Sequence, residues 1–104
     1  MAPVIFRVWG RDKEVMALFP AEPADYEGRY CSSYAHVGQH GSADYAGCVM
    51  RSRPATPEEY ADLLAELKSY GTGEEYADIK VYRRATRQHR DAFNATLREM
   101  RSGR

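Results

Sequence analysis

The chain has 104 residues, of which 43% are hydrophobic, with 15 basic and 15 acidic side chains. This length and apolar content give one globular domain with a modest core and exclude a disordered chain. No segment reaches the roughly 18 apolar residues that span a membrane, and the start lacks a signal-peptide pattern. We therefore expect one cytoplasmic domain over residues 1–104, with Cys31 and Cys48 as free thiols.

The first apolar runs predict a β-hairpin. Val4 to Trp9 and Val15 to Phe19 are rich in apolar and β-branched residues, and the polar residues 10–13 between them are turn-like. Both runs are partly apolar on both faces, which indicates that at least one strand lies inside the sheet. Pro20 and Pro23 are expected to end the second strand, because proline donates no hydrogen bond to a ladder.

The next stretch predicts a second hairpin. Tyr30 to Ala35 has a weak strand pattern, and Tyr45 to Arg51, with adjacent valine and methionine, has a stronger one. If both are strands, the segment from His36 to Asp44 is the connection between them.

The sequence TPEEYADLLAELKSYG predicts a helix with clear ends. Thr56 is a suitable N-cap, Pro57 suits the first helical position, and Glu59 completes a capping box. Gly71 stands where a left-handed C-terminal residue is favoured. The apolar residues at helical spacing are Tyr60, Leu63, Leu64, Leu67 and Tyr70.

A strand and a second helix complete the predicted elements. Residues 76–83 alternate, so Ile79 and Val81 are expected on one face of a half-buried strand. Thr86 is expected to cap a final helix, and residues 101–104 to form a frayed tail. The order β-β-(β)-β-α-β-α indicates an α+β fold, with an antiparallel-rich sheet of four or five strands and two helices on one face.

Charge is unevenly distributed, although the net charge is zero. Residues 80–104 carry eight basic and two acidic side chains, a net charge of +6, so the remainder carries −6. A basic end of this kind can contact an acidic partner, a phosphate or the chain's own acidic helix, and it is most simply read as solvated surface. The acidic remainder would repel a long polyanion, so binding to long nucleic acids is not expected.

The segment SYAHVGQHGSADY, from Ser33 to Tyr45, is the leading candidate for a binding site. Its glycines leave backbone amides open to an anion, its tyrosines can stack on a base, and its glutamine can read a base edge. The structural alternative assigns the glycines to turns and packs the tyrosines with their hydroxyls at the surface. The predicted ligand-binding residues are Tyr34, His36, Gln39, His40, Tyr45 and Arg51.

Metal binding and catalysis are weaker interpretations of the same segment. His36 and His40 have the spacing of a zinc-binding pair on a helix, but Gly38 and Gly41 argue against a helix there. A cysteine or serine nucleophile with one of these histidines lacks a surrounding nucleophile elbow. We therefore expect no metal, no cofactor and no catalytic residue, while a metal-dependent or Cys/His-dependent hydrolase stays an alternative.

The stretches VIFRVW, EVMALFP, CSSYAHVGQHGSADY and RPATPEEYADLLAELKSYG form a specific pattern over residues 3–85. In this pattern the chain resembles a widespread group of small uncharacterised proteins from bacterial and phage genomes. The resemblance implies a phage or mobile-element background and transfers no catalytic residue. It favours binding over catalysis, because small phage proteins often bind a host protein or a host signalling molecule.

Taken together, the sequence predicts a small non-enzymatic binding protein whose ligand is a small anion such as a nucleotide. The alternative partner is a host protein, contacted through exposed tyrosines and the uneven charge. Homo-oligomerisation is a further expectation, since small sheets often pair edges or pack helices to enlarge their core.

Overall fold

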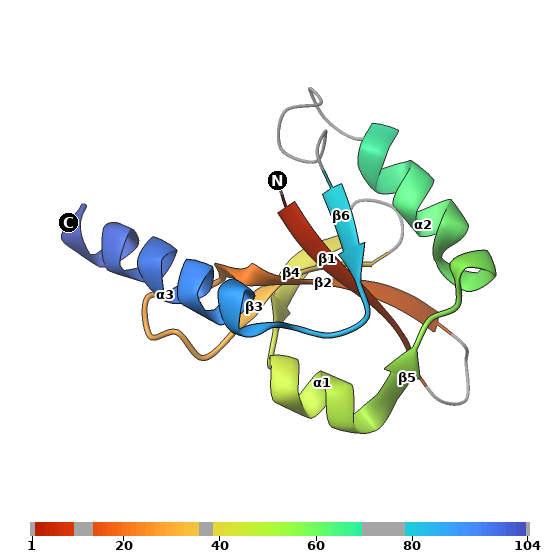
Figure 1. Cartoon of the computed structure of the whole chain (residues 1–104), viewed down its shortest axis with the longest axis horizontal. Coiled ribbons are helices and arrows are strands. Elements are labelled where there is room, and N and C mark those ends of the chain that lie inside the picture. The colour runs from red at the N-terminus through yellow and green to blue at the C-terminus, as the bar shows by residue number, and fades with distance from the viewer. Residues whose placement is uncertain (1, 10–13, 36–38, 70–78, 104) are drawn as a thin grey trace.

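The computed structural model describes residues 2–9, 14–35, 39–69 and 79–103. Within these ranges it confirms the α+β fold, with six strands rather than four or five and three helices rather than two. The elements in chain order (Figure 1) are β1 (Ala2–Trp9), β2 (Glu14–Pro23), β3 (Cys31–Ala35), β4 (Gln39–Ala43), α1 (Tyr45–Arg51), β5 (Ser52–Pro54), α2 (Pro57–Ser69), β6 (Ile79–Tyr82) and α3 (Arg87–Ser102).

All six strands belong to one sheet with the order β4-β3-β2-β1-β5, and β6 also pairs with β1. The first half of β1 runs parallel to β6, whereas its second half runs antiparallel to β5. On its other side β1 pairs antiparallel with β2, with Ile5 opposite Leu18. The expectation of an interior strand is therefore confirmed for both β1 and β2.

Helices cover both faces of the sheet, so the expectation that they lie on one face is wrong. Successive residues of a strand point to opposite faces. Phe6 belongs to a core cluster with Leu67 of α2, whereas Ile5 belongs to a second cluster with Cys48 of α1, against which Phe93 of α3 packs. Because β1 and β2 carry apolar side chains on both faces, a helix must pack on each face of the sheet to shield these side chains from water.

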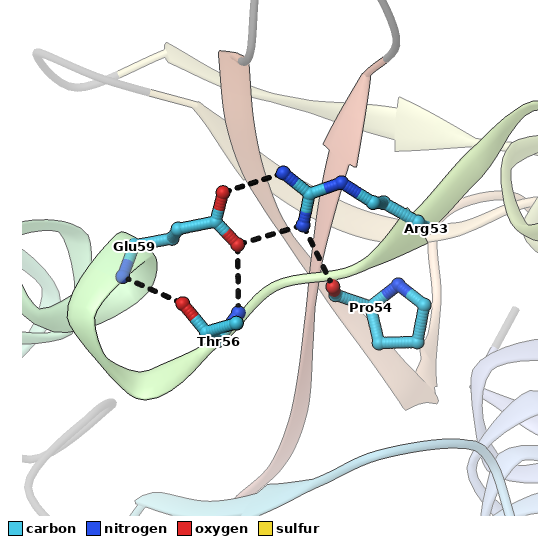
Figure 2. Close-up of polar contacts among 4 residues, drawn as sticks. All are labelled: Arg53, Pro54, Thr56 and Glu59. Carbon is cyan, nitrogen blue, oxygen red and sulfur yellow. Dashed lines mark hydrogen bonds and ion pairs between the residues drawn. The ribbon is translucent and has the colours of Figure 1, made fainter.

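The capping box predicted for α2 is present, and Arg53 extends it (Figure 2). The Thr56 hydroxyl accepts a hydrogen bond from the Glu59 amide at 3.3 Å, and the Glu59 carboxylate accepts one from the Thr56 amide at 2.9 Å. Arg53 donates to both carboxylate oxygens, at 2.7 and 2.6 Å. These bonds lower the pKa of Glu59 to about 2, chiefly through Arg53 and then through Thr56.

The apolar stripe predicted for α2 faces the sheet. Leu67 is fully buried, and Tyr60 stacks on Phe6 of β1 with ring centroids 4.5 Å apart. Tyr70, at the end of the stripe, and the expected C-cap Gly71 lie outside the described residues. The described part of α2 therefore docks through the side chains that its periodicity indicates.

Residues 45–51 form helix α1, so the strand predicted there is wrong. The C-terminal end of α1 is held by Arg7 of β1, which donates to the carbonyls of Val49 at 2.9 Å and Ser52 at 2.6 Å. The last carbonyls of a helix have no partner within the helix, and these bonds supply one. A local pattern cannot report such a contact, because Arg7 and Val49 are 42 residues apart.

Two strand boundaries also correct the sequence interpretation. β2 continues through Pro20 to Pro23, because its register with β3 shifts after Phe19 and prolines are tolerated at such irregularities. β4, Gln39–Ala43, lies within the stretch that was expected to be only a connection, and it pairs antiparallel with β3. The second hairpin therefore exists, but its returning strand comes earlier than predicted.

The C-terminal elements largely follow the prediction. Ile79 and Val81 of β6 pack against the cluster beneath α2, while residues 76–78 and the turn expected at 10–13 lie outside the described residues. Thr86 caps α3 as expected. The frayed tail does not begin at residue 101, because α3 continues to Ser102.

Candidate functional site

An open groove of about 890 Å³ lies where the start of α1, the start of α3 and the turn between β2 and β3 come together. In Figure 1, α3 runs along the part of the sheet that β2 and β3 form, and α1 lies on the side of the N-terminal end of α3. The lining side chains that bear on recognition are Arg29, Tyr30, Tyr45, Arg87, Arg90 and Phe93. The groove thus combines three guanidinium groups with three aromatic rings.

The turn between β2 and β3 presents Arg29 and Tyr30 to the groove. The Asp25 carboxylate accepts hydrogen bonds from the amides of Gly28 at 2.9 Å and Arg29 at 3.1 Å. Gly28 has a φ of +76°, and a Cβ there would lie 2.7 Å from the Leu97 side chain of α3. Both the left-handed conformation and the close approach to α3 therefore require glycine at this position.

The opposite wall is formed by Tyr45 at the start of α1. Its hydroxyl accepts a hydrogen bond from the backbone amide of Ala85 at 2.8 Å, which ties α1 to the segment before α3. The hydroxyl is thereby engaged, and the half-buried Tyr45 lines the groove while it also packs against the core cluster of Ile5 and Cys48.

The start of α3 carries the site's unpaired positive charge. Arg87 and Arg90 are three residues apart, so their side chains lie on neighbouring positions of one helix face. Both are exposed, and neither guanidinium has an ion pair or hydrogen bond within the described ranges. Two acidic residues, Asp44 and Asp91, also line the groove. Together with Arg29 the lining side chains carry a net charge of +1.

The N-terminus of α3 is fixed by a capping box in which His89 takes the place of the usual glutamate or glutamine. The Thr86 hydroxyl accepts from the His89 amide at 3.2 Å, and Nδ1 of His89 accepts from the Thr86 amide at 3.1 Å. The His89 ring is buried and meets the edge of Tyr82 at a centroid distance of 4.3 Å. Burial lowers the pKa of His89, which keeps the ring neutral and able to accept.

Three of the residues predicted from the sequence, Tyr34, Tyr45 and Arg51, have described side chains, and the structure does not bring these three together. Tyr45 lines the groove, but Tyr34 is fully buried and its hydroxyl donates to Glu66 of α2 on the other face of the sheet. Arg51, at the end of α1, lies over the Trp9 ring at 5.8 Å.

The remaining predicted residues fall in or near β4. The backbone of Gln39 and His40 lies in this strand, with His40 opposite Tyr34, but their side chains lie outside the described part of the chain. His36 lies outside it as well. The described part of the segment from Ser33 to Tyr45 is therefore mostly sheet, and within that part only Asp44 and Tyr45 line the groove.

Sequence reasoning missed the groove residues Arg29, Tyr30, Arg87, Arg90 and Phe93. The excess of basic residues after residue 80 was the signal that points toward Arg87 and Arg90. Nothing local links them to Tyr30, because the β2–β3 turn and α3 meet only in the folded chain.

Neither cysteine is placed for nucleophilic chemistry. Cys31 and Cys48 are free and buried in the same core cluster. Burial raises the pKa of Cys31 to about 11 and also raises the pKa of Cys48, so both thiols are protonated near neutral pH. Among the described residues, no three histidine, cysteine or acidic side chains lie close enough to hold a metal ion.

Comparison with known proteins assigns no family to the chain. No family model, no curated protein and no solved structure matches it. Within the described residues, no helix has both the length and the apolar composition needed to cross a membrane.

Proposed function

We propose that this protein is a non-enzymatic binding module whose groove between α1, α3 and the β2–β3 turn takes a small anionic ligand with a planar ring, such as a nucleotide. The observation that carries the proposal is the pair Arg87 and Arg90. Two exposed guanidinium groups without a carboxylate partner among the described residues border a concave surface. Guanidinium groups donate paired hydrogen bonds that fit a phosphate or carboxylate.

The aromatic side chains of the groove support a ligand with a ring. Tyr30 is 41% exposed, and Tyr45 and Phe93 are half-buried residues that line the groove. Aromatic rings beside cationic groups suit a base joined to a phosphate, because the base stacks while the phosphate is neutralised.

The charge of the groove favours a small ligand over a polymer. The first-turn amides of α3 that Thr86 does not cap add positive potential to that of Arg87 and Arg90. Asp44 and Asp91 oppose it, and Arg29 is partly neutralised by Glu27 at 3.3 Å. The remaining positive charge of the groove suits a ligand with one or two negative charges. A long polyanion would be repelled by the two aspartates and by the acidic residues elsewhere in the chain.

The proposal is tested by calorimetric titration with a panel of nucleoside mono- and diphosphates. Replacing both Arg87 and Arg90 by glutamine should weaken binding about tenfold or more per lost charge-assisted contact. Arg98→Gln, an exposed change on the same helix outside the groove, is the matched control and should bind as the wild type does.

A second pair of variants tests whether an aromatic side chain of the groove contacts the ligand. Tyr30→Ala should weaken binding, and Tyr26→Ala, which changes a similarly exposed tyrosine outside this groove, should not. Equal effects of both changes, or no binding of any nucleotide by the wild type, would contradict the proposal.

A protein partner is the second candidate, favoured by Met50, which is 85% exposed on α1. An exposed methionine is common on surfaces that bind other proteins. Met50 does not line the groove, so Met50→Ala separates the two functions: it should weaken capture of a protein partner and leave nucleotide binding unchanged.

A further inference from the structure

β4 is an edge of the sheet, and no described strand pairs with its outer side. In the strand order its one neighbour is β3. Alternate residues of an antiparallel strand direct their amide and carbonyl groups away from the paired strand. No described residue outside β3 hydrogen-bonds to the backbone of Gly41, Ser42 or Ala43, and Gly41 and Ser42 are exposed.

The two edges of the sheet differ in how they are protected. Edge strands usually avoid pairing with another chain by being short or by carrying charge or proline. On one edge, β5 has three residues that include Arg53 and Pro54, and β6 has four that include Lys80. On the other edge, β4 has five residues, QHGSA, with no proline, lysine, arginine or acidic residue.

We propose that β4 is a self-association edge, at which two copies of the chain pair their β4 strands antiparallel about a two-fold axis at Gly41 and form one continuous sheet. Gly41 is the middle residue of β4, so this register places Gly41 opposite its own copy and Ser42 opposite His40 of the partner subunit. Small residues at the axis allow the backbones to approach. Identical strands of this composition also meet without repulsion between like charges, so a second copy of the chain fits this edge.

The expected affinity is low, and the site is separate from the groove. Pairing two five-residue strands buries much less than the roughly 1,200 Å² of a stable interface. We therefore expect weak association, with the dimer populated only toward the upper end of the concentration range used below. Gly41 and Ser42 do not line the groove between α1 and α3, so dimerisation and ligand binding can be measured independently.

Sedimentation of the full chain between about 1 µM and about 1 mM tests the proposal. The wild type should pass from monomer to dimer over this range. Ser42→Lys and Ser42→Glu each place like charges diagonally across the axis, so each alone should weaken the dimer about tenfold or more. An equimolar mixture of the two variants should restore it. Thr96→Lys, which adds the same charge to an exposed position of α3, should sediment as the wild type does.

The outcomes are distinct. A wild type that stays monomeric throughout overturns the proposal, including the case in which β4 takes a strand from another protein. A dimer that resists both Ser42 variants, or a mixture that fails to associate, assigns self-association to another surface. Hydrogen exchange of the wild type gives a readout without mutation, since those amides of residues 41–43 that face away from β3 should exchange more slowly at the higher concentration. If the exchange of these amides did not depend on protein concentration, that result would also overturn the proposal.

Discussion

At the scale of single residues, buried polar side chains fix parts of the fold that the hydrophobic pattern leaves open. Arg7 is only 6% exposed, and its guanidinium donates to Ser52 Oγ at 2.9 Å as well as to two carbonyls at the end of α1. Burial lowers the pKa of Arg7, and the partial negative charge of a helix C-terminus compensates its positive charge. Arg7 thereby joins β1 to α1, which forms one wall of the groove.

Replacing Arg7 by methionine should destabilise the protein by about 2–4 kcal/mol, because it leaves the carbonyls of Val49 and Ser52 without a donor. Urea unfolding measures the effect. Arg98→Met, which removes an exposed arginine, should change stability by less than about 0.5 kcal/mol. Similar midpoints for the two variants would show that Arg7 does not hold α1.

His89 makes stability depend on pH near neutrality. Its folded pKa lies below the unfolded value of about 6.5, because burial favours the neutral ring. The stabilisation is therefore present above the unfolded pKa and is lost as pH falls through the folded pKa, when Nδ1 can no longer accept from Thr86. His89→Gln keeps a capping acceptor that does not titrate, so it should lose less stability than the wild type between pH 7 and pH 5. Equal losses would contradict this role of the imidazole.

At the scale of elements, the sequence was most informative where the determinants are local. The capping box of α2 joins Thr56 and Glu59, which are three residues apart, and the sequence predicts both of these residues and their roles. The sequence predicts a strand in place of helix α1, because its N-cap has no side-chain capping bond and its seven residues are held by Arg7 and by the hydrogen bond between Tyr45 and Ala85. Both partners lie about forty residues away or more, beyond any local pattern.

The Arg53–Glu59 pair gives α2 an acid dependence with a defined sign. The pKa of Glu59 falls from 4.5 to about 2 in the folded chain, so the stabilisation is present above pH 4.5 and is lost as pH falls toward 2. Glu59→Gln should therefore flatten the dependence of melting temperature on pH in this window. Glu58→Gln, at the exposed neighbouring position, should leave it unchanged. A wild-type profile in the Glu59 variant would exclude the ion pair as its source.

At the scale of the whole molecule, the fold class and the positions of α2 and α3 could be predicted, but α1, the strand order and the site could not. The alternation of Ile79 and Val81 indicates a strand, yet says nothing of its parallel pairing with β1. In the same way the tyrosines at 34 and 45 look equivalent in sequence. β3 and α1 carry them to different places, one beneath α2 and one to the groove.

The two-sided core also predicts how the cysteines behave. Cys31 of β3 and Cys48 of α1 are buried in one core cluster and have raised pKa values, so both should react slowly with a thiol reagent in the native protein. After unfolding in urea, without a reductant, both should react at once. Fast labelling of the native chain would show that this face of the core opens without global unfolding, and a missing thiol after unfolding would indicate a disulfide.

The central claim is that the groove between α1, α3 and the β2–β3 turn is the binding site. The most direct measurement is an amide NMR titration of the wild type with nucleoside mono- and diphosphates. We predict that chemical shifts change at residues 28–31, 44–46 and 86–94, and that the changes are lost in the Arg87→Gln, Arg90→Gln double variant. Changes centred on β4, or none with any of these ligands, would contradict the account.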